Sequence, residues 1–419
     1  MKISVITLGC KTNQAESFHL ERTLMGHGHE VVELSETPDI CVINTCTVTA
    51  KADCQSRQML QRALKKGAQV IITGCYAELY EERLQQQGDA IRVVKNDEKK
   101  RIISLIEGQD SSNSGSVRYY PRHRPIVKVQ DGCNYSCSYC AIPRARGRSR
   151  SIPVPEIVEE ISFYSDAGFH EVVLTGIHLG TYGADLAPQV TLGRLLKEIL
   201  TATAIKKVRL SSLEIREIDD ELHEVLQEER LCKHLHVPLQ SGSENILKLM
   251  NRMYTKEEFL QGIEKVADRF PAIGLGTDVI VGFPGESDKD FEETRSLLES
   301  LPFSYLHVFP YSVRPGTRAA SFSDHVAAAV KKERVSLLRD LGRRKSAAYL
   351  QAAIGKKLWT VIEKVGETGA VGTTDNYIKV FLENSDSLRE GMLVLAHITG
   401  AGRDRALAVP EYNAELSLL

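Results

Sequence analysis

The chain has 419 residues, and at roughly 100–200 residues per domain this length predicts two to four domains. Hydrophobic residues make up 42% and charged residues 26%, which is ordinary globular composition and excludes global disorder. The apolar runs are far shorter than the ~18 residues of a membrane helix, and the N-terminus reads as a strand rather than a signal peptide. We therefore expect a cytoplasmic protein without membrane contact. The net charge is -2, so any nucleic-acid contact must come from a local patch.

The first hundred residues alternate between predicted strands and predicted helices. Strands are expected at Lys2–Leu8, Glu30–Leu34, Asp39–Asn44, Gln69–Thr73 and Ile91–Val94, with helices at Asn13–Gly26, Thr47–Lys66, Tyr76–Gln87 and Glu98–Ile106. Asn13 and Glu16 suggest a variant capping box at the first helix. The alternation predicts a doubly wound parallel α/β domain over residues 1–110.

A second βα series follows the polar linker Gly108–Gly115. Its strands are expected at Ile126–Gln130, Glu171–Thr175, Lys207–Ser211, His234–Val237, Gly274–Val281 and Tyr305–Phe309. Six βα units predict a complete or partial barrel over residues 116–350, with its chemistry at the carboxyl ends of the strands. After a long helix at His325–Ala353, short strands predict a small all-β barrel over residues 354–419.

The strongest chemical signal is a C-x3-C-x2-C motif formed by Cys133, Cys137 and Cys140. Three thiolates within eight residues can bind one face of a 4Fe–4S cluster, and the missing fourth cysteine leaves one iron open to a small molecule. A zinc site without its fourth ligand and a chance grouping are the alternatives. The motif follows the first predicted barrel strand, which favours the cluster.

Three more cysteines, Cys10, Cys46 and Cys75, each follow a predicted strand of the first domain. Parallel strands end at one edge of a sheet, so these distant residues are expected to meet there and to bind a second cluster. The alternative is that they are buried structural cysteines. That alternative suits the other three, Cys41, Cys54 and Cys232.

These motifs resemble the radical S-adenosylmethionine (SAM) superfamily, and the whole chain resembles its methylthiotransferase family. The matching segments are TLGCKTN at Thr7–Asn13, NTC at Asn44–Cys46, TGC at Thr73–Cys75, Asp131–Cys140, LQSG at Leu239–Gly242, DVIVGFPGE at Asp278–Glu286 and HVFPYSVRPGT at His307–Thr317. The resemblance implies two 4Fe–4S clusters and a terminal TRAM domain that binds RNA. One cluster, on Cys133, Cys137 and Cys140, would cleave SAM to a radical. The other, on Cys10, Cys46 and Cys75, would carry the sulfur to be inserted.

The resemblance also implies that residues at the ends of barrel strands contact SAM, which serves as methyl donor and radical source. These residues are Thr175, Gly176, Ser212, Glu214, Gln240 and Gly282. Each could instead be a turn or capping residue. A glycine at 282 would let the backbone approach the adenine, and the carboxylate of Glu214 would suit the positive sulfonium. No side-chain general base is expected, and no catalytic residues are expected beyond the cluster ligands.

Lys11, Ile142–Ser151 and Leu174–Gly183 resemble the MtaB-type branch of the family, which methylthiolates C2 of N6-threonylcarbamoyladenosine 37 in tRNA. Residues 116–150 hold eight basic residues and one acidic residue, a local net charge of +7. We expect the anticodon loop to contact arginines of this stretch, with Tyr119 and Tyr120 stacking on bases. These arginines are Arg122, Arg124, Arg144, Arg146, Arg148 and Arg150. A solvated charge run is the alternative.

The remaining partners follow from the resemblance or stay open. We expect a reduced flavodoxin- or ferredoxin-type electron donor and a monomeric enzyme, while the sulfur source is not indicated. Three alternative functions remain at this point. They are methylthiolation of a ribosomal-protein aspartate, methylthiolation of isopentenyladenosine in tRNA, and an iron–sulfur RNA-binding protein without transferase activity.

Overall fold

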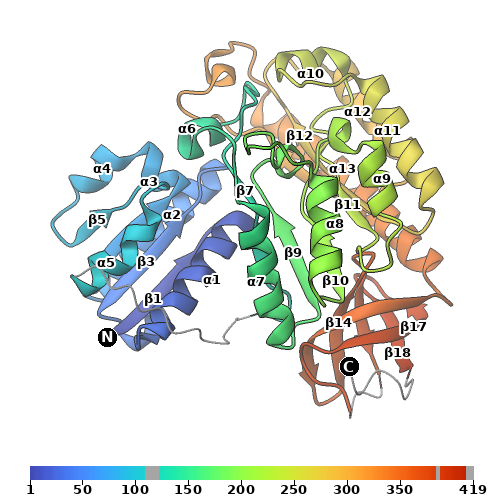
Figure 1. The fold of residues 1–419 in the computed structure, drawn as a ribbon. Helices are drawn as coiled ribbons and strands as arrows, with labels where there is room; N and C mark the ends of the chain where they lie inside the picture. Colours follow the sequence, from blue (N-terminus) through green and yellow to red (C-terminus); the bar gives the residue numbers. More distant parts are fainter. Residues whose placement is uncertain (109–121, 384–386, 412–419) are drawn as a thin grey trace. The chain divides into compact units, whose positions relative to one another are not determined.

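The computed structural model describes residues 1–108, 122–383 and 387–411 (Figure 1). The chain forms two compact units. Unit one comprises Met1–Pro121, Gln130–Arg150 and Ser312–Ser321, and unit two comprises Arg122–Val129, Ser151–Tyr311 and Phe322–Leu419. Both cysteine groups singled out above fall in unit one. The domain boundaries expected at 1–110, 116–350 and 354–419 stay predictions.

Unit one is built on a five-stranded, all-parallel sheet in the order β2-β1-β3-β4-β5. Its strands are β1 (Lys2–Thr7), β2 (Glu30–Val31), β3 (Ile40–Thr45), β4 (Gln69–Gly74) and β5 (Ile91–Val93). The chain order reverses between β1 and β3, and in such sheets the ligand crevice lies at the carboxyl ends of the strands on either side of the reversal.

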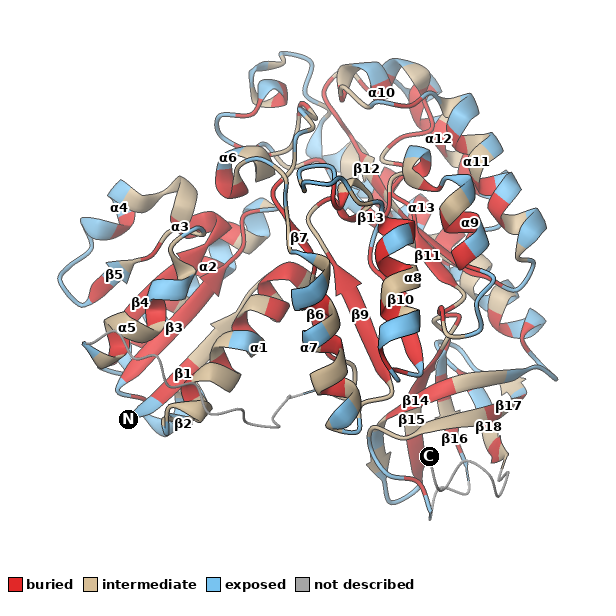
Figure 2. Ribbon diagram, viewed as in Figure 1, coloured by how far each residue is buried: buried red, intermediate tan, exposed pale blue. Residues whose placement is uncertain are grey.

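Helices cover both faces of this sheet, as the sequence predicts. They are α1 (Lys11–Gly26), α2 (Ala50–Lys65), α3 (Cys75–Leu79), α4 (Glu81–Gln85) and α5 (Ile102–Glu107). Ile40 and Val42 of β3 share a core with α1 and α5, whereas Cys41 and Ile43 share another core with α2, α3 and α4. Successive side chains of a strand point to opposite faces, so a continuous apolar run fills both cores. Figure 2 shows β3 buried along its length.

The start of α1 differs from the expected capping box. The N-cap residue is Cys10, and Asn13 lies inside the helix. The side-chain amide of Asn13 donates to the carbonyl oxygens of Leu8 at 2.7 Å and Thr45 at 2.9 Å. Asn13 therefore ties together the ends of β1 and β3 instead of capping a helix. A second difference is that the helix expected at Tyr76–Gln87 is divided into α3 and α4.

Glu21 of α1 gives a pH-dependent prediction. Burial, with a smaller contribution from Glu33, raises the pKa of Glu21 from 4.5 to about 7. The folded chain thus keeps a proton that the unfolded chain releases, and this stabilisation is complete below about pH 4.5 and lost as the pH rises through 7. We expect Glu21→Gln to be more stable than the wild type at pH 8 by about 2–3 kcal/mol. The difference should shrink toward pH 4.5.

Urea unfolding followed by circular dichroism at pH 5 and pH 8 measures this difference. Glu30→Gln, which changes an exposed carboxyl on β2, is the matched control. A Glu21→Gln effect of equal size at both pH values would contradict the buried proton.

Unit two contains the second βα series. Its parallel strands are β6 (Ile126–Lys128), β9 (Glu171–Thr175), β10 (Lys207–Leu210), β11 (His234–His236), β12 (Gly274–Val281) and β13 (Tyr305–Pro310). They form the sheets β10-β9-β6 and β11-β12-β13, which isolated parallel bridges at Val208–Leu231 and Ser212–His236 connect. Within the described residues β6 and β13 do not pair, so the expected partial barrel of six strands is confirmed.

The helices of unit two lie between these strands in sequence, except that the last one follows β13. They are α7 (Val154–Asp166), α8 (Leu192–Ala202), α9 (Asp220–Val225), α10 (Glu244–Leu249), α11 (Lys256–Arg269), α12 (Asp288–Ser300) and α13 (Ala328–Ala352). Capping boxes begin α11 at Thr255 and α12 at Ser287. In unit one, the cysteine loop and the helix α6 (Ile142–Arg146) lie in sequence between two short strands, β7 (Gln130–Asp131) and β8 (Arg150–Ser151), and unit two resumes at Ser151.

The C-terminal strands close into the expected small barrel in the order β14-β15-β16-β18-β17. The strands are β14 (Lys357–Gly366), β15 (Gly369–Thr374), β16 (Lys379–Leu382), β17 (Leu393–Ala401) and β18 (Ala406–Glu411). Arg209 of β10 anchors this barrel to the partial barrel. Its guanidinium is fully buried, pairs with Glu171 at 2.7 Å and donates to the Thr374 and Asp375 carbonyls at 3.0 and 3.1 Å.

Candidate functional site

Cys10, Cys46 and Cys75 lie at the carboxyl ends of three neighbouring strands in unit one. Cys10 follows β1 as the N-cap of α1, Cys46 follows β3 directly, and Cys75 follows β4 as the first residue of α3. The register pairs Thr7 with Asn44 and Thr45 with Gly74, so the strands end together. The structure therefore brings these cysteines to one sheet edge, as expected from the sequence.

Two glycines allow the strand ends to approach each other so closely. Gly9 has φ +98°, and a Cβ there would lie 2.5 Å from the Cys46 sulfur. Gly74 has φ +91°, and a Cβ there would overlap the Thr45 backbone. Both positions require a left-handed backbone and leave no room for a side chain. The turns before Cys10 and Cys75 thus depend on glycine.

The electrostatics of the three thiols fit a positively charged ligand. Burial raises the pKa of Cys46 to about 12, and the neighbouring Cys10 and Cys75 add to this rise. Burial also raises the pKa of Cys75, although the charge of Arg146 opposes it. Three thiolates so close together repel one another unless a cation neutralises them, and the iron of a 4Fe–4S cluster supplies that charge. The donor set therefore fits a cluster.

The second group, Cys133, Cys137 and Cys140, lies on the loop between β7 and α6. All three cysteines are partly exposed. The Cys133 amide donates to the Gly147 carbonyl at 3.1 Å, and the Cys140 amide donates to the Cys137 carbonyl at 3.0 Å. These bonds fold the loop back on itself, with the sulfurs on one short segment. The spacing and the partial exposure fit a cluster with one iron open to a ligand.

The segment Ser312–Ser321 supports both cysteine groups. Arg314 donates to the Thr47 carbonyl at 2.9 Å and to the Asp53 carboxylate at 2.6 Å, which holds the chain just after Cys46. The Ala319 amide donates to the Ser138 carbonyl at 2.7 Å, inside the other cysteine loop. The sequence shows this segment as a family-like motif but does not reveal its contacts, which join residues more than 150 positions apart.

Arg146 corrects an expectation. Its side chain is fully buried, whereas an RNA contact needs an exposed one. The guanidinium donates to Cys75 Sγ at 3.3 Å, Glu16 Oε1 at 2.9 Å, Asp131 Oδ1 at 2.8 Å and Asn13 Oδ1 at 2.5 Å. With two carboxylates paired to it, Arg146 is part of the structure around Cys75. Its assignment as an RNA contact is wrong in this fold.

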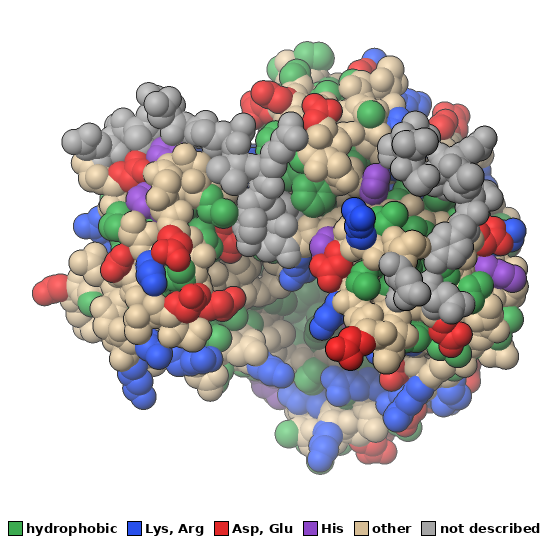
Figure 3. All heavy atoms as spheres, turned by 90° about the horizontal axis from the view of Figure 1, so that it is seen from below, with side chains coloured by type: hydrophobic (Ala, Val, Ile, Leu, Met, Phe, Trp, Pro, Cys, Tyr) green, Lys and Arg blue, Asp and Glu red, His purple; other side chains and the backbone are tan. Residues whose placement is uncertain are grey.

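The other arginines of this stretch differ in their exposure. Arg122, Arg144, Arg148 and Arg150 are exposed. Arg124 is only partly exposed and forms ion pairs with Glu363 and Glu171, so its charge is already balanced by carboxylates. Tyr119 and Tyr120 lie outside the described residues. Figure 3 shows acidic and basic side chains interspersed on the face that it draws, in keeping with the net charge of -2.

The six residues expected to contact SAM lie at or after the ends of β9, β10, β11 and β12 in unit two. Three have structural roles of their own. Glu214 is the N-cap of a short 3-10 helix and forms an ion pair with Arg252. Its negative charge is therefore already partly balanced by an arginine. Gly282 has φ +70°, its amide donates to Glu286 at 2.9 Å, and a Cβ there would overlap Lys331. The backbone amide of Gln240 donates to the backbone carbonyl of Asp278 at 2.8 Å.

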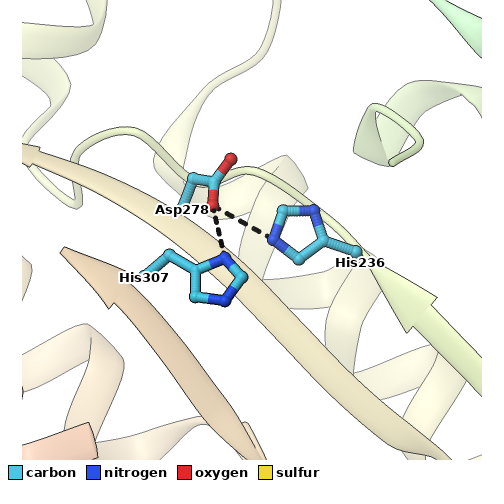
Figure 4. A group of neighbouring side chains, drawn as sticks. All are labelled: His236, Asp278 and His307. Carbon is cyan, nitrogen blue, oxygen red and sulfur yellow. Dashed lines mark hydrogen bonds and ion pairs between the residues drawn. The ribbon is translucent and has the colours of Figure 1, made fainter. Parts of the chain in front are cut away.

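Sequence reasoning missed a cluster of three side chains on β11, β12 and β13. Figure 4 shows His236, Asp278 and His307 pointing toward one another. Asp278 Oδ1 lies 3.1 Å from both His236 Nε2 and His307 Nδ1. Burial alone would raise the pKa of Asp278, but its contacts with the two imidazoles hold that pKa well below its usual range. Each strand was predicted, but their register, which sets Asp278 opposite His307, was not.

The remaining cysteines are only partly as expected. Cys41 and Cys232 are buried, as structural cysteines should be. Cys54 is exposed on α2, so the expectation that it is a buried structural residue is wrong. In the part of the chain that the structure describes, the helices are too short or too polar to cross a membrane.

Comparisons with known proteins agree with this arrangement. The radical SAM superfamily profile matches residues 127–298, and the profile of uncharacterized protein family UPF0004 matches residues 2–95. The threonylcarbamoyladenosine tRNA methylthiotransferase MtaB of Aquifex aeolicus (strain VF5) is 37% identical over 91% of this chain and 96% of the relative. The MtaB protein of Bacillus subtilis (strain 168) is 36% identical over 94% of this chain and 93% of the relative.

Two further proteins are similar to this chain, one in sequence and one in fold. A tRNA-2-methylthio-N(6)-dimethylallyladenosine synthase of Fusobacterium nucleatum is 34% identical over 91% of this chain and 94% of the relative. The structure of the radical SAM methyltransferase TsrM from Kitasatospora setae has a TM-score of 0.55 at 16% identity, covering 76% of this chain and 77% of that one. The second likeness concerns the fold alone. The superfamily match implies a 4Fe–4S cluster and SAM as cofactors. With full-length relatives at this level of identity, the chain belongs to the radical SAM methylthiotransferase family.

Proposed function

We propose that the protein is a tRNA methylthiotransferase that modifies C2 of N6-threonylcarbamoyladenosine 37. The observation that carries this is the pair of three-cysteine groups within one unit of a chain whose full-length relatives carry that name. A three-thiol site leaves one iron open, and methylthio transfer needs two such openings. One is for SAM and the other is for the sulfur to be inserted.

We propose that Cys133, Cys137 and Cys140 hold the cluster that supplies the electron for SAM cleavage. Cys10, Cys46 and Cys75 hold the auxiliary cluster. Gly9 and Gly74 keep the auxiliary cysteines close, and Arg146 places a positive charge beside Cys75. Thr175, Gly176, Ser212, Glu214, Gln240 and Gly282 are proposed to position SAM, which is supported by their place at the carboxyl ends of the strands. A flavodoxin- or ferredoxin-type protein is the proposed electron donor.

For the tRNA, we propose that Arg144, Arg148 and Arg150 contact phosphates of the anticodon loop. This proposal is supported by the positions of the three arginines, which are exposed, closely spaced and adjacent to the cysteine loop in sequence. Arg122 joins this set, whereas Arg124 and Arg146 leave it because carboxylates hold them. Residues 356–419 have seven basic and nine acidic side chains, so the RNA role proposed for the terminal barrel rests on the family resemblance.

An isopentenyladenosine substrate is the second candidate, because the Fusobacterium relative named for that substrate is 34% identical over most of its length. The two substrates differ at the N6 substituent, which is polar and carries a carboxylate in one and is apolar in the other. Sites built to hydrogen-bond a substituent reject analogues without it by several orders of magnitude. A direct comparison of substrates therefore decides between them.

The test is anaerobic turnover of the reconstituted enzyme with SAM, a reductant and tRNA carrying threonylcarbamoyl-, isopentenyl- or unmodified adenosine 37. Nucleoside mass spectrometry measures the methylthio product. We expect product from the threonylcarbamoyl tRNA and roughly 100-fold less or none from the others. Equal turnover of the isopentenyl tRNA would overturn the substrate assignment. An Arg144→Ala, Arg148→Ala double variant tests the RNA surface in the same assay, since its tRNA affinity should fall and become less salt-dependent.

A further inference from the structure

The cluster of His236, Asp278 and His307 lies in unit two and has no part in the proposed cysteine sites. The three residues sit on one face of neighbouring parallel strands. On the other face of the same strands, Leu235 and Val279 are fully buried, as is Val237 directly after β11. The strands therefore direct their apolar side chains one way and this polar group the other way.

The donor set is two imidazole nitrogens and one carboxylate oxygen. Their ligand atoms all lie within 4.8 Å of one another, and two of the three separations are 3.1 Å. Ligand atoms bound at 2.0–2.2 Å to one ion are separated by about 3.0–3.4 Å when the bond angles lie near 90–110°. The two separations from Asp278 Oδ1 thus already match the spacing of cis ligands around a first-row metal ion.

Hydrogen bonding alone leaves one atom of the cluster unexplained. His236 is only 8% exposed, and its Nε2 has no hydrogen-bond partner among the described residues. The Asp278 oxygen at 3.1 Å lies at ion-pair distance but without the alignment of a hydrogen bond. Leaving a buried polar nitrogen without a hydrogen bond destabilises the fold. A cation between Nε2 and Oδ1 would satisfy both atoms.

The outer contact of His236 is the kind that metal-bound histidines make. Its Nδ1 lies 2.8 Å from the Ser212 hydroxyl. When Nδ1 carries the proton and donates it to Ser212, Nε2 presents a lone pair toward Asp278. A second ring nitrogen fixed by an oxygen partner orients a histidine for metal binding and sets its tautomer.

We propose that His236 Nε2, Asp278 Oδ1 and His307 Nδ1 form a binding site for a divalent first-row transition metal such as Zn²⁺. Two imidazoles and a single carboxylate suit zinc or ferrous iron, whereas Mg²⁺ and Ca²⁺ prefer oxygen ligands in greater number. Three protein ligands leave at least one position on the ion for water or for an oxygen of a bound molecule. The partly exposed side chain of His307 leaves this site accessible.

The test uses the anaerobic holoenzyme with both clusters in place and Zn²⁺ as the probe, without SAM or tRNA. After equilibrium dialysis, elemental analysis gives zinc and iron per chain. We expect one zinc per wild-type chain, with iron unchanged. His307→Gln and Asp278→Asn should weaken zinc binding by roughly 100-fold or more. His19→Gln, which changes an exposed histidine on α1, should bind zinc like the wild type.

Thermal unfolding adds a second measurement that does not depend on activity. Zn²⁺ should raise the Tm of the wild type and of His19→Gln, because an ion that binds only the folded state stabilises it. It should leave the Tm of His307→Gln unchanged. His307 is half exposed, so this variant should fold even if Asp278→Asn does not. Equal zinc binding by the wild type and His307→Gln would overturn the site, whatever the outcome of the tRNA assay.

Discussion

Cys46→Ala is expected to cleave SAM at near wild-type rates while forming no methylthio product. The physical reason is that Cys46 is one of the three thiols that the described residues place at the sheet edge, and a cluster with two remaining ligands is not retained. The group on Cys133, Cys137 and Cys140 keeps all three of its thiols in this variant. Chromatography of 5′-deoxyadenosine and mass spectrometry of the tRNA nucleosides measure the two outcomes separately.

Iron content gives the matching result for each group. The reconstituted wild type should hold about eight irons, and Cys46→Ala about half of them. The triple variant Cys133→Ala, Cys137→Ala, Cys140→Ala should also lose about half, but together with all SAM cleavage. Cys54→Ala is the matched control, because Cys54 is exposed and lies outside both groups. Normal methylthio transfer by Cys46→Ala would contradict the auxiliary-cluster proposal.

The positions of the cysteines could be predicted because they depend on short-range signals. The β-branched runs before Cys10, Cys46 and Cys75 mark strands, and the neighbouring glycines mark their ends. Parallel pairing then requires the strand ends to meet at one edge. The structure pairs β1 with β3 and β3 with β4, as this argument needs. No knowledge of side-chain packing was required.

The surroundings of the cysteines could not be predicted in this way. Arg146 has the same sequence context as the exposed Arg144 and Arg148, and only the fold shows that Glu16 and Cys75 reach it. Those partners are 130 and 71 residues away. The polar cluster at Asp278 was not predicted for a similar reason. Its three members come from three strands, and the register between those strands cannot be derived from the sequence. Charge can be read from a sequence, but burial and register depend on tertiary packing.

Removing the buried guanidinium of Arg146 is expected to lower the stability of the fold. Burial opposes its charge, but Glu16, Cys75 and Asp131 outweigh that cost and raise the pKa of Arg146 well above its ordinary value. Removing the charge in Arg146→Met would take away the guanidinium that Glu16 and Asp131 share, although Glu16 would keep its ion pair with Lys99. Breaking a buried ion pair on one side typically costs about 3–5 kcal/mol. We expect this variant to unfold at markedly lower urea concentration, measured by circular dichroism.

Arg146→Lys separates the role of the charge from that of the hydrogen bonds. Lysine keeps the positive charge but lacks the planar fork that reaches Cys75, Glu16, Asp131 and Asn13 together. Hydrogen bonds to cluster sulfurs are one of the factors that set the potential, and losing a donor favours the more oxidised state. We therefore expect Arg146→Lys to retain both clusters, with the auxiliary potential shifted to more negative values in an EPR-monitored redox titration. Arg144→Lys, on the exposed side of the same helix, should leave both stability and potential unchanged. If the two lysine variants behave alike, the contact between Arg146 and Cys75 has no electronic role.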